Sequence, residues 1–220
     1  MAIFRGTIRS KSLVMDTVVN VIVPYEHFYI PPKAPHDKTV ILLHGLKQNA
    51  DAWPRMSRIE QYAHITGFNV VIPEVQRSFY TDMPHGLRYF EYITEEIPQM
   101  LKAVYNIPVD RDHLYVAGLS MGGFGALKCA LTYPDRFAGA MSYSGGLRAL
   151  EHVKDYPELL PAEEFKAILG MDLQCQPENN LMLLAEKTAT AMKKPKLYIA
   201  CGTEDFLIQG NREVNEHVSK

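Results

Sequence analysis

Cysteine, net charge and long apolar runs are all scarce in this chain of 220 residues. The three cysteines, Cys129, Cys175 and Cys201, form no CxxC pair and have no histidine neighbours. This argues against a disulfide framework or a metal site and indicates reduced thiols in a cytoplasmic protein. A formal charge of -2 gives no reason to expect nucleic acid or an anionic membrane as a partner. No run approaches the ~20 apolar residues of a membrane span, and the N-terminus lacks the pattern of a signal peptide.

The apolar residues that are present alternate between short continuous runs and longer helical stripes. The runs fit strands buried on both faces of a parallel sheet, and the stripes fit helices lying on that sheet. Strands are expected at residues 40–43, 68–72, 113–117, 137–143 and 196–200, and helices at residues 51–66, 88–105 and 121–133. Two runs rich in Val, Ile and Thr, residues 4–8 and 14–23, predict an antiparallel pair at the sheet edge.

These elements predict a single α/β domain over residues 1–220, built on a doubly wound, mostly parallel sheet. Residues 145–194 contain helical patches but no clear strand. Ligands of such folds bind beyond the carboxyl ends of the strands. We therefore expect this stretch to form a cap or substrate-pocket insertion above that edge of the sheet.

Ser120 lies in the run Gly118-Leu119-Ser120-Met121-Gly122, directly after an expected strand and directly before an expected helix. A serine with glycines two positions away on either side can occupy a sharp strand-to-helix turn, because the glycines leave room for closely approaching backbone. The N–H groups at the start of the helix then face the reacting centre. Chance matches to this motif arise in roughly a few per cent of chains of this size. We therefore interpret Ser120 as a catalytic nucleophile.

The segment His44-Gly45-Leu46 follows the expected strand at residues 40–43. Hydrolases with this kind of serine turn take one oxyanion donor from that loop and the other from the residue after the nucleophile. The backbone N–H groups of Leu46 and Met121 are therefore the expected donors, and Gly45 lets the loop approach the substrate. His44 is a candidate base, but its place in this loop favours a structural hydrogen-bonding role.

An acidic candidate follows the expected strand at residues 196–200. Asp205 comes after Ser120 in the chain, which fits the order nucleophile, acid, histidine. Its role would be to hold the tautomer of the histidine and to stabilise the imidazolium. Glu204 is the rival acid. Either carboxylate could instead cap a helix that starts near Phe206, and this role could coexist with catalysis.

Five segments together carry a resemblance to a known family: Leu42-Leu43-His44-Gly45, Arg77-Ser78-Phe79-Tyr80-Thr81-Asp82, residues 117–127, Ser144-Gly145-Gly146 and Gly202-Thr203-Glu204-Asp205. In these segments, and over essentially its whole length, the chain resembles the esterase D-like branch of the α/β hydrolases, especially small bacterial tributyrin and acetyl esterases. The resemblance implies a three-layer sandwich with antiparallel N-terminal strands. It also implies hydrolysis of short-chain acetyl or butyryl esters through an acyl-enzyme, without metal or organic cofactor.

By the same resemblance, Ser120 is the nucleophile, Asp205 the triad acid, and Leu46 and Met121 the oxyanion donors. The partner is a small-molecule ester. Residues implied near the substrate pocket are His44, Gly45, Trp53, Ser144 and Gly145. A helix-packing role is at least as well supported for Trp53. Small esterases of this resemblance often associate, so a homo-oligomer is one option.

The histidine is where the chain departs from the family pattern. After the acid, the fold needs a helix, a last strand and a loop with the base, or ~25 to 35 residues, whereas fifteen follow Asp205. The only later histidine, His217, would lie ~18 Å along a helix and is interpreted as a surface residue. The earlier histidines lack motif support, with His85 the least implausible substitute: His27, His36, His64, His85, His113 and His152. We therefore expect a truncated chain without the last strand and base, and turnover lowered by several orders of magnitude.

Two other functions stay open on the sequence alone. One is acyl transfer to a sugar or lipid by an enzyme of the same fold. The other is a non-catalytic binding or scaffold role for a hydrolase-fold protein without its triad histidine. The absence of the histidine favours the second alternative, whereas the intact turn at Ser120 and the presence of Asp205 argue against it.

Overall fold

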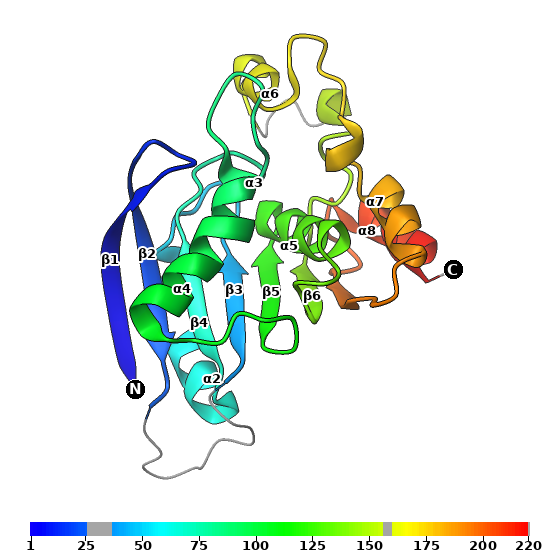
Figure 1. Ribbon diagram of the computed structural model, residues 1–220. Coiled ribbons are helices and arrows are strands. Elements are labelled where there is room, and N and C mark those ends of the chain that lie inside the picture. Colours follow the sequence, from blue (N-terminus) through cyan, green and yellow to red (C-terminus); the bar gives the residue numbers. More distant parts are fainter. Residues whose placement is uncertain (26–36, 156–159, 220) are drawn as a thin grey trace.

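A seven-stranded mixed sheet forms the centre of the molecule (Figure 1). The structure is a computed structural model, and it describes residues 1–25, 37–155 and 160–219. The strand order is β1-β2-β4-β3-β5-β6-β7. The strands are β1 (Ala2–Ser10), β2 (Met15–Val23), β3 (Thr39–Leu43), β4 (Asn69–Pro73), β5 (Leu114–Leu119), β6 (Gly139–Tyr143) and β7 (Lys196–Ala200).

The sheet is antiparallel at its N-terminal edge and parallel elsewhere. Strand β2 runs antiparallel to β1 and β4, whereas β4, β3, β5, β6 and β7 run parallel to one another. In the register, Leu43 lies opposite Gly118, Leu119 opposite Tyr143, and Tyr143 opposite Ala200. The carboxyl ends of these strands therefore form one edge, which is where parallel α/β sheets bind ligands.

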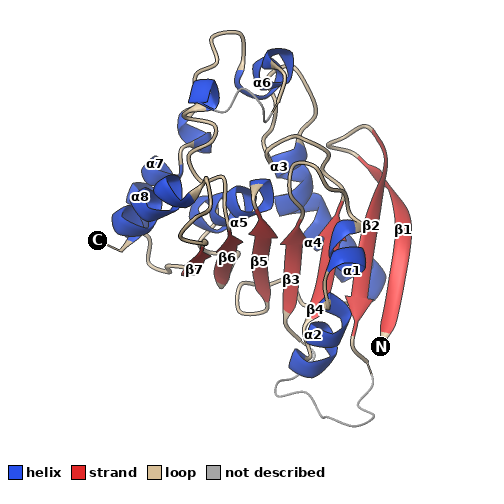
Figure 2. Ribbon diagram, turned by 180° about the vertical axis from the view of Figure 1, so that it is seen from behind, coloured by secondary structure: helices blue, strands red, loops and turns tan. Residues whose placement is uncertain are grey.

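Helices cover both faces of the sheet and so complete three layers (Figure 2). One face carries α1 (Ala52–Met56) and α2 (Ile59–Thr66), and the other carries α3 (Tyr89–Glu91), the π-helical stretch η1 (Tyr92–Glu96), α4 (Ile97–Tyr105) and α5 (Met121–Thr132). Each face has its own apolar cluster, a small one around Ile22, Leu42 and Ile72 and a large one around α5. The expected fold, a three-layer α/β sandwich with antiparallel N-terminal strands, is confirmed.

The expected single helix over residues 51–66 is wrong. The backbone becomes extended at Ser57, with φ -141° and ψ 178°, and this residue separates α1 from α2. The Ser57 hydroxyl donates to the carbonyl of Trp53 and accepts the N–H of Ile59. Serine side chains compete in this way with helical backbone hydrogen bonds. The apolar pattern of residues 51–66 does not reveal this break, because the helical spacing of apolar residues continues in α2.

Residues 145–194 connect β6 to β7. In their described part they form η2 (Val153–Asp155), α6 (Ala162–Leu169), η3 (Pro177–Asn179) and α7 (Leu181–Ala189). Helix α6 lies beyond the carboxyl ends of the strands, whereas α7 lies beside α5 and next to the last helix, α8 (Ile208–Val218) (Figure 1). None of the helices in the described ranges is long and apolar enough to cross a membrane.

Candidate active site

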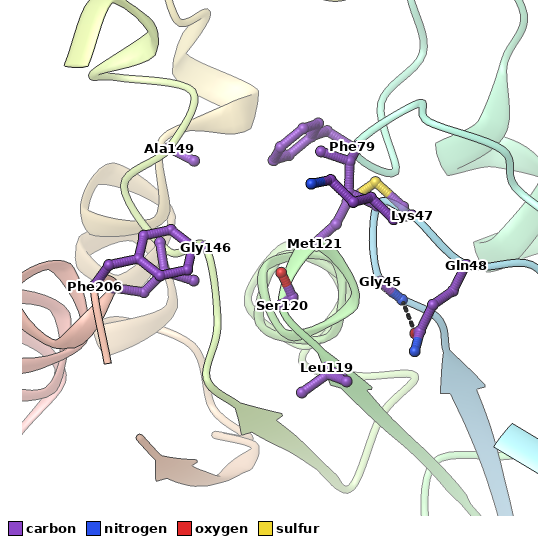
Figure 3. Close-up of a pocket in the computed structure, with 12 residues that line it drawn as sticks. Gly45, Lys47, Gln48, Phe79, Leu119, Ser120, Met121, Gly146, Ala149 and Phe206 are labelled. Atoms are coloured by element: carbon purple, nitrogen blue, oxygen red, sulfur yellow. Dashed lines mark hydrogen bonds between the residues drawn. The ribbon is translucent and has the colours of Figure 1, made fainter. Parts of the chain in front are cut away.

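Ser120 occupies a sharp turn between β5 and α5. Its backbone has φ 57° and ψ -116°, a left-handed conformation that a residue with a side chain adopts only where its surroundings enforce it. The N–H of Ser120 donates to the carbonyl of Tyr143 at 2.9 Å, and its carbonyl accepts the N–H of Gly146 at 3.0 Å. These two bonds fix the turn to β6 and to the loop that follows it, so the side chain is held at the carboxyl edge of the sheet (Figure 3).

The glycines on either side of Ser120 are required by close backbone contacts. A Cβ at Gly118 would lie 2.8 Å from the Cα of Gly122. A Cβ at Gly122 would lie 2.9 Å from the carbonyl oxygen of His44 and would overlap that of Leu43. Both distances are far below van der Waals contact. Glycine therefore allows α5 to start against the end of β3, which brings Ser120 next to the loop at residues 44–48.

A cavity of about 310 Å³ opens at the Ser120 side chain. Its walls come from both sides of the serine, with Phe79 and Lys47 on one side and Phe206 and Gly146 on the other (Figure 3). The full lining is Gly45, Leu46, Lys47, Gln48, Phe79, Leu119, Ser120, Met121, Gly146, Ala149, Phe206 and Leu207. Apolar walls with a few polar groups are typical of sites for small organic molecules.

Both expected oxyanion donors, Leu46 and Met121, line this cavity beside Ser120. Met121 is the first residue of α5, so its N–H has no partner within the helix. Among the described residues, no acceptor takes the N–H of Leu46. The preceding Gly45 N–H is occupied, because it donates to Oε1 of Gln48 at 2.9 Å. The arrangement leaves two backbone donors available at the cavity wall, which is the requirement for stabilising an oxyanion.

Asp205 lies in the turn after β7, at the same edge of the sheet. Its Oδ1 accepts the N–H of Leu207 at 2.9 Å, and the next residue, Phe206, lines the cavity. Burial raises the pKa of the neighbouring Cys201 thiol, and the Asp205 carboxylate beside it contributes to the rise. The rival acid Glu204 is exposed. The structure therefore places Asp205 next to the cavity wall, in a turn whose backbone it also stabilises.

The remaining expected pocket residues are distributed around the cavity rather than gathered in it. Gly45 lines the cavity, but Gly145 and Ser144 do not, and the N–H of Ser144 bonds the carbonyl of Ala200 at 2.7 Å. Trp53 donates through Nε1 to the carbonyl of Leu43 at 3.1 Å. It lines a separate cavity of about 170 Å³. Within residues 1–25, 37–155 and 160–219, no group of three or more His, Cys, Asp or Glu could hold a metal ion.

Comparison with known proteins assigns this arrangement to a family. The model of the esterase family described as "Putative esterase" matches residues 10–217. The chain belongs to this esterase family. It is 31% identical over 225 residues to an acetyl esterase of Caldicellulosiruptor saccharolyticus, which covers 97% of the chain and 85% of that protein. An S-formylglutathione hydrolase of Paracoccus denitrificans is 28% identical over 141 residues, covering 53% of the chain and 50% of that protein.

Solved structures show the same relationship. The esterase superimposes on the substrate-bound fluorophosphonate-binding serine hydrolase F (FphF) of Staphylococcus aureus with a TM-score of 0.85 and 31% identity, over 99% of the chain and 86% of that chain. It also superimposes on the S-formylglutathione hydrolase FrmB apoenzyme of Staphylococcus aureus, with a TM-score of 0.83 and 30% identity over the same shares. The expected relationship to α/β-hydrolase esterases is confirmed, and the chain is a carboxylic-ester hydrolase by family.

His44 of the esterase is fully buried and does not line the cavity. Its Nδ1 lies 2.9 Å from the carbonyl oxygen of Gly45, and its Nε2 accepts the N–H of Val75 at 3.2 Å. Both ring nitrogens therefore form hydrogen bonds with backbone groups, and the ring connects the loop at residues 44–48 to the end of β4. This is the geometry of a residue that shapes the loop rather than of a base beside Ser120.

The other described histidines also lie outside the cavity lining. His217 is on α8, 3.5 Å from Glu186, and His85 is exposed in the loop before α3. His113 lies 2.7 Å from Asp110, and His152 lies 3.5 Å from Asp155. His27 and His36 lie outside the described residues.

Tyr80 is a functional neighbour that the sequence reasoning missed. Its hydroxyl donates to the carbonyl of His44 at 2.8 Å, and burial raises the pKa of this hydroxyl well above its ordinary value, so it stays a donor. Its ring packs so closely on α5 that a Cβ at Gly125 would lie 2.5 Å from it. Phe79 and Tyr80 both have positive φ, 49° and 54°. In the sequence, Tyr80 was marked only by its place in the segment at residues 77–82, which carried the family resemblance without indicating a role for this residue.

Lys128 of α5 is a second missed residue. Its side chain is buried, and its Nζ donates to the carbonyl of Tyr80 at 3.0 Å and to Oδ1 of Asn179 at 2.6 Å. The ammonium also lies 4.1 Å from the centre of the Phe90 ring, a cation–π distance. Burial lowers the pKa of Lys128 to about 8. Lys128 therefore joins the nucleophile helix, the segment at residues 77–82 and the connection between β6 and β7.

Proposed function

We propose that the protein is a serine carboxylesterase that hydrolyses short-chain acyl esters through an acyl-Ser120 intermediate. The observation that carries the proposal is the strained turn at Ser120, which presents the side chain to a cavity of about 310 Å³ between Leu46 and Met121. A cavity of this size accepts small esters. The likeness to an acetyl esterase supports a short acyl group.

The chemical steps follow from this geometry. Oγ of Ser120 attacks the ester carbonyl carbon, its proton passes to a base, and the N–H groups of Leu46 and Met121 stabilise the oxyanion. Collapse of the intermediate breaks the bond to the alkoxy oxygen, which leaves as the alcohol with the transferred proton. Water then attacks the acyl group by the same route and releases the carboxylic acid and free Ser120. Asp205 would orient the base and stabilise its protonated form.

The proton acceptor is open to a direct test, because none of the described histidines lines the cavity. If no group of the chain supplies the base, added imidazole will raise the rate of p-nitrophenyl acetate hydrolysis by the wild type above the rate with imidazole alone, whereas Ser120→Ala will show only the rate of imidazole alone. A rate that is already high and insensitive to imidazole would show that the chain provides its own base. The pH profile of kcat/KM would then report its pKa.

The proposal as a whole is tested with Ser120→Ala. If the chain supplies a base, we expect this variant to lose hydrolysis of p-nitrophenyl acetate and butyrate by roughly 10³-fold or more, because the step that forms the acyl-enzyme is removed; without one, the loss appears in the imidazole-dependent rate. A fluorophosphonate probe should add its mass at Ser120 in the wild type only. Ser219→Ala, at the exposed end of α8, is the matched control and should keep both properties. Equal hydrolysis by wild type and Ser120→Ala would refute the proposal.

A further inference from the structure

Gln48 lines the cavity at Ser120, but its side chain has no role in the steps proposed above. Its side chain lies alongside Gly45, with Oε1 accepting the Gly45 N–H at 2.9 Å (Figure 3). Its Nε2 lies 3.8 Å from Sδ of Met56, a weak contact. The side chain is therefore held at one end by the loop and at the other by α1. It is half-buried and lines the cavity at Ser120.

A second cavity, of about 170 Å³, lies behind this side chain. Gln48 and Leu119 line both cavities, so these two side chains form the wall between them. Leu119 belongs to β5 and directly precedes the nucleophile. The other residues that line the second cavity are Ala52, Trp53, Met56 and Ser57.

The second cavity has mainly apolar walls, and the position of one lining residue, Trp53, is fixed by a hydrogen bond. The indole of Trp53 is held by its hydrogen bond to the carbonyl of Leu43, and Ala52 is buried at the start of α1. Another cavity that touches Gln48 is polar by contrast, with Asn49 and Arg55 in its lining. An alkyl chain that passed Gln48 would therefore gain most by entering the space beside Trp53, where its methylenes leave water.

The direction of a bound ester follows from the proposed reaction. The group that takes the Ser120 proton returns it to the leaving alcohol, so the alcohol lies on the side of the acid. Asp205 precedes Phe206, which lies on the opposite side of Ser120 from Gln48 (Figure 3). The acyl group then extends from the carbonyl carbon towards Gln48 and Leu119.

We propose that Gln48 sets the acyl-chain length of the esterase by closing the cavity at Ser120 against the apolar cavity beside Trp53. This inference rests on the proposed esterase function. With Gln48 in place, the acyl chain ends within the first cavity, and short acyl groups are favoured. Shortening the side chain joins the two cavities and lets a longer acyl chain pass along Leu119. Gln48 is thus a specificity-determining residue, separate from its hydrogen bond to Gly45.

The test compares Gln48→Ala with Gln48→Met. Alanine opens the wall and removes the acceptor of the Gly45 N–H, whereas methionine removes the acceptor but keeps the length of the side chain. The readout is the ratio of kcat/KM for p-nitrophenyl octanoate to that for p-nitrophenyl acetate. Any general loss of activity from the loop cancels in this ratio. Each newly buried methylene is worth about a fourfold change, so two of them should raise the ratio about tenfold or more in Gln48→Ala.

The same ratio should stay within about threefold of wild type in Gln48→Met, since less than one methylene is newly buried. An unchanged ratio in Gln48→Ala, or an equal rise in both variants, would overturn the role of Gln48 as a wall. A rise for octyl acetate over methyl acetate, without a rise for the octanoate, would overturn the assignment of the acyl group to this side.

A binding measurement separates this inference from the proposed function. Calorimetry of methyl octanoate and methyl butanoate is carried out on Ser120→Ala and on Ser120→Ala with Gln48→Ala. The second protein should gain affinity for the octanoate about tenfold relative to the butanoate. If no Ser120-dependent hydrolysis is found but this gain appears, the esterase proposal fails and the divided cavity stands. If hydrolysis is found and the gain is absent, the esterase proposal stands and the proposed role of Gln48 fails.

Discussion

The two sides of the Ser120 cavity are built differently. The serine side comprises residues 44–48, 79–80 and 118–125, and its central members His44, Tyr80 and Met121 are buried. The acid side comprises residues 144–146 and 201–207. There Phe206 is 65% exposed, and Tyr198 of the adjoining strand β7 is 56% exposed. The serine side of the cavity is thus buried at its centre, whereas the acid side combines the buried Leu207 with the exposed Phe206.

This contrast indicates where stability and activity are coupled. On the serine side, the contacts that place the oxyanion loop are the contacts that fill the core, as with Gly122 against Leu43. On the acid side, the carboxylate of Asp205 is held by a backbone N–H within its own turn. Substitutions on the serine side should therefore lower both stability and activity, whereas substitutions on the acid side should change activity alone.

The largest effect on activity is expected from Asp205→Asn. If Asp205 orients the base, this variant should lower kcat for p-nitrophenyl acetate by about 10³- to 10⁴-fold. Its stability should change by less than about 0.5 kcal/mol, because Oδ1 of asparagine can still accept the Leu207 N–H. Chemical denaturation and steady-state kinetics measure the two quantities. Glu204→Gln is the matched control and should match wild type in both. A comparable loss of activity in Glu204→Gln would move the acid to that residue.

Gly122→Ala should disrupt the packing of the serine side. The added Cβ would meet the carbonyl of His44 at 2.9 Å, so either α5 or the loop must shift. We expect a loss of roughly 3 kcal/mol in the free energy of unfolding, as for overpacked sites, and a loss of roughly 100-fold in kcat from the displaced oxyanion donors.

Gly202→Ala is the equivalent change on the acid side. Its Cβ would lie 3.9 Å from that of Asp205, an ordinary contact. Urea unfolding of both variants measures the contrast. Two similar losses of stability would show that the two sides are packed alike.

Tyr80→Phe is a smaller change on the serine side. It removes the donor to the carbonyl of His44 and leaves that buried oxygen unpaired, which should cost about 1 to 3 kcal/mol of stability. We expect kcat to fall about tenfold, because His44 belongs to the oxyanion loop. Tyr198→Phe, on β7, should change neither quantity, since its side chain is largely exposed. A Tyr80→Phe enzyme with lower stability and unchanged kcat would separate packing from catalysis on this side.

The smallest effect is a pH dependence due to Lys128. Its pKa is lowered from 10.5 to about 8 by burial, so between these values the unfolded chain binds more protons than the folded protein. The free energy of unfolding of the wild type should therefore rise with pH in this window, with a contribution of at most about 1.4 kcal/mol per pH unit from this group.

Lys128→Met should lack this contribution. Urea unfolding at several pH values between 7 and 10 measures it as the difference in slope between variant and wild type. Lys196→Met, at an exposed position of β7, should keep the wild-type slope. Identical slopes for wild type and Lys128→Met would show that the buried ammonium is not a separate contributor to stability.

The sequence was sufficient for features that local patterns determine. The continuous apolar runs predicted the parallel strands, because such runs are buried on both faces of a sheet. The spacing of Gly118 and Gly122 around Ser120 predicted the strained turn, which the backbone shows directly. The roles of Ser120, Asp205, Leu46 and Met121 stay predictions that the variants above test.

Features that depend on contacts distant in sequence were missed. Lysine is usually exposed, so nothing local indicated that Lys128 is buried against Asn179, 51 positions away. Gln48 has no motif, and its position between two cavities depends on Leu119, a residue of β5 that is distant in sequence. Trp53 was expected either near the pocket or in helix packing, and it lines the cavity that shares Gln48 and Leu119 with the cavity at Ser120.

The positive φ values at Phe79 and Tyr80 have a consequence for engineering. Each left-handed residue with a side chain costs about 1 kcal/mol, but truncating a buried aromatic side chain costs about 3 to 5 kcal/mol, so glycine at either position should lower stability although it would relieve the backbone. Glycine at either position would remove a ring, one from the cavity wall and the other from the contact with α5. A stabilising design that places glycine wherever φ is positive would therefore damage both the core and the cavity wall at these two positions. Residues 79 and 80 should be held fixed in any library made from this scaffold.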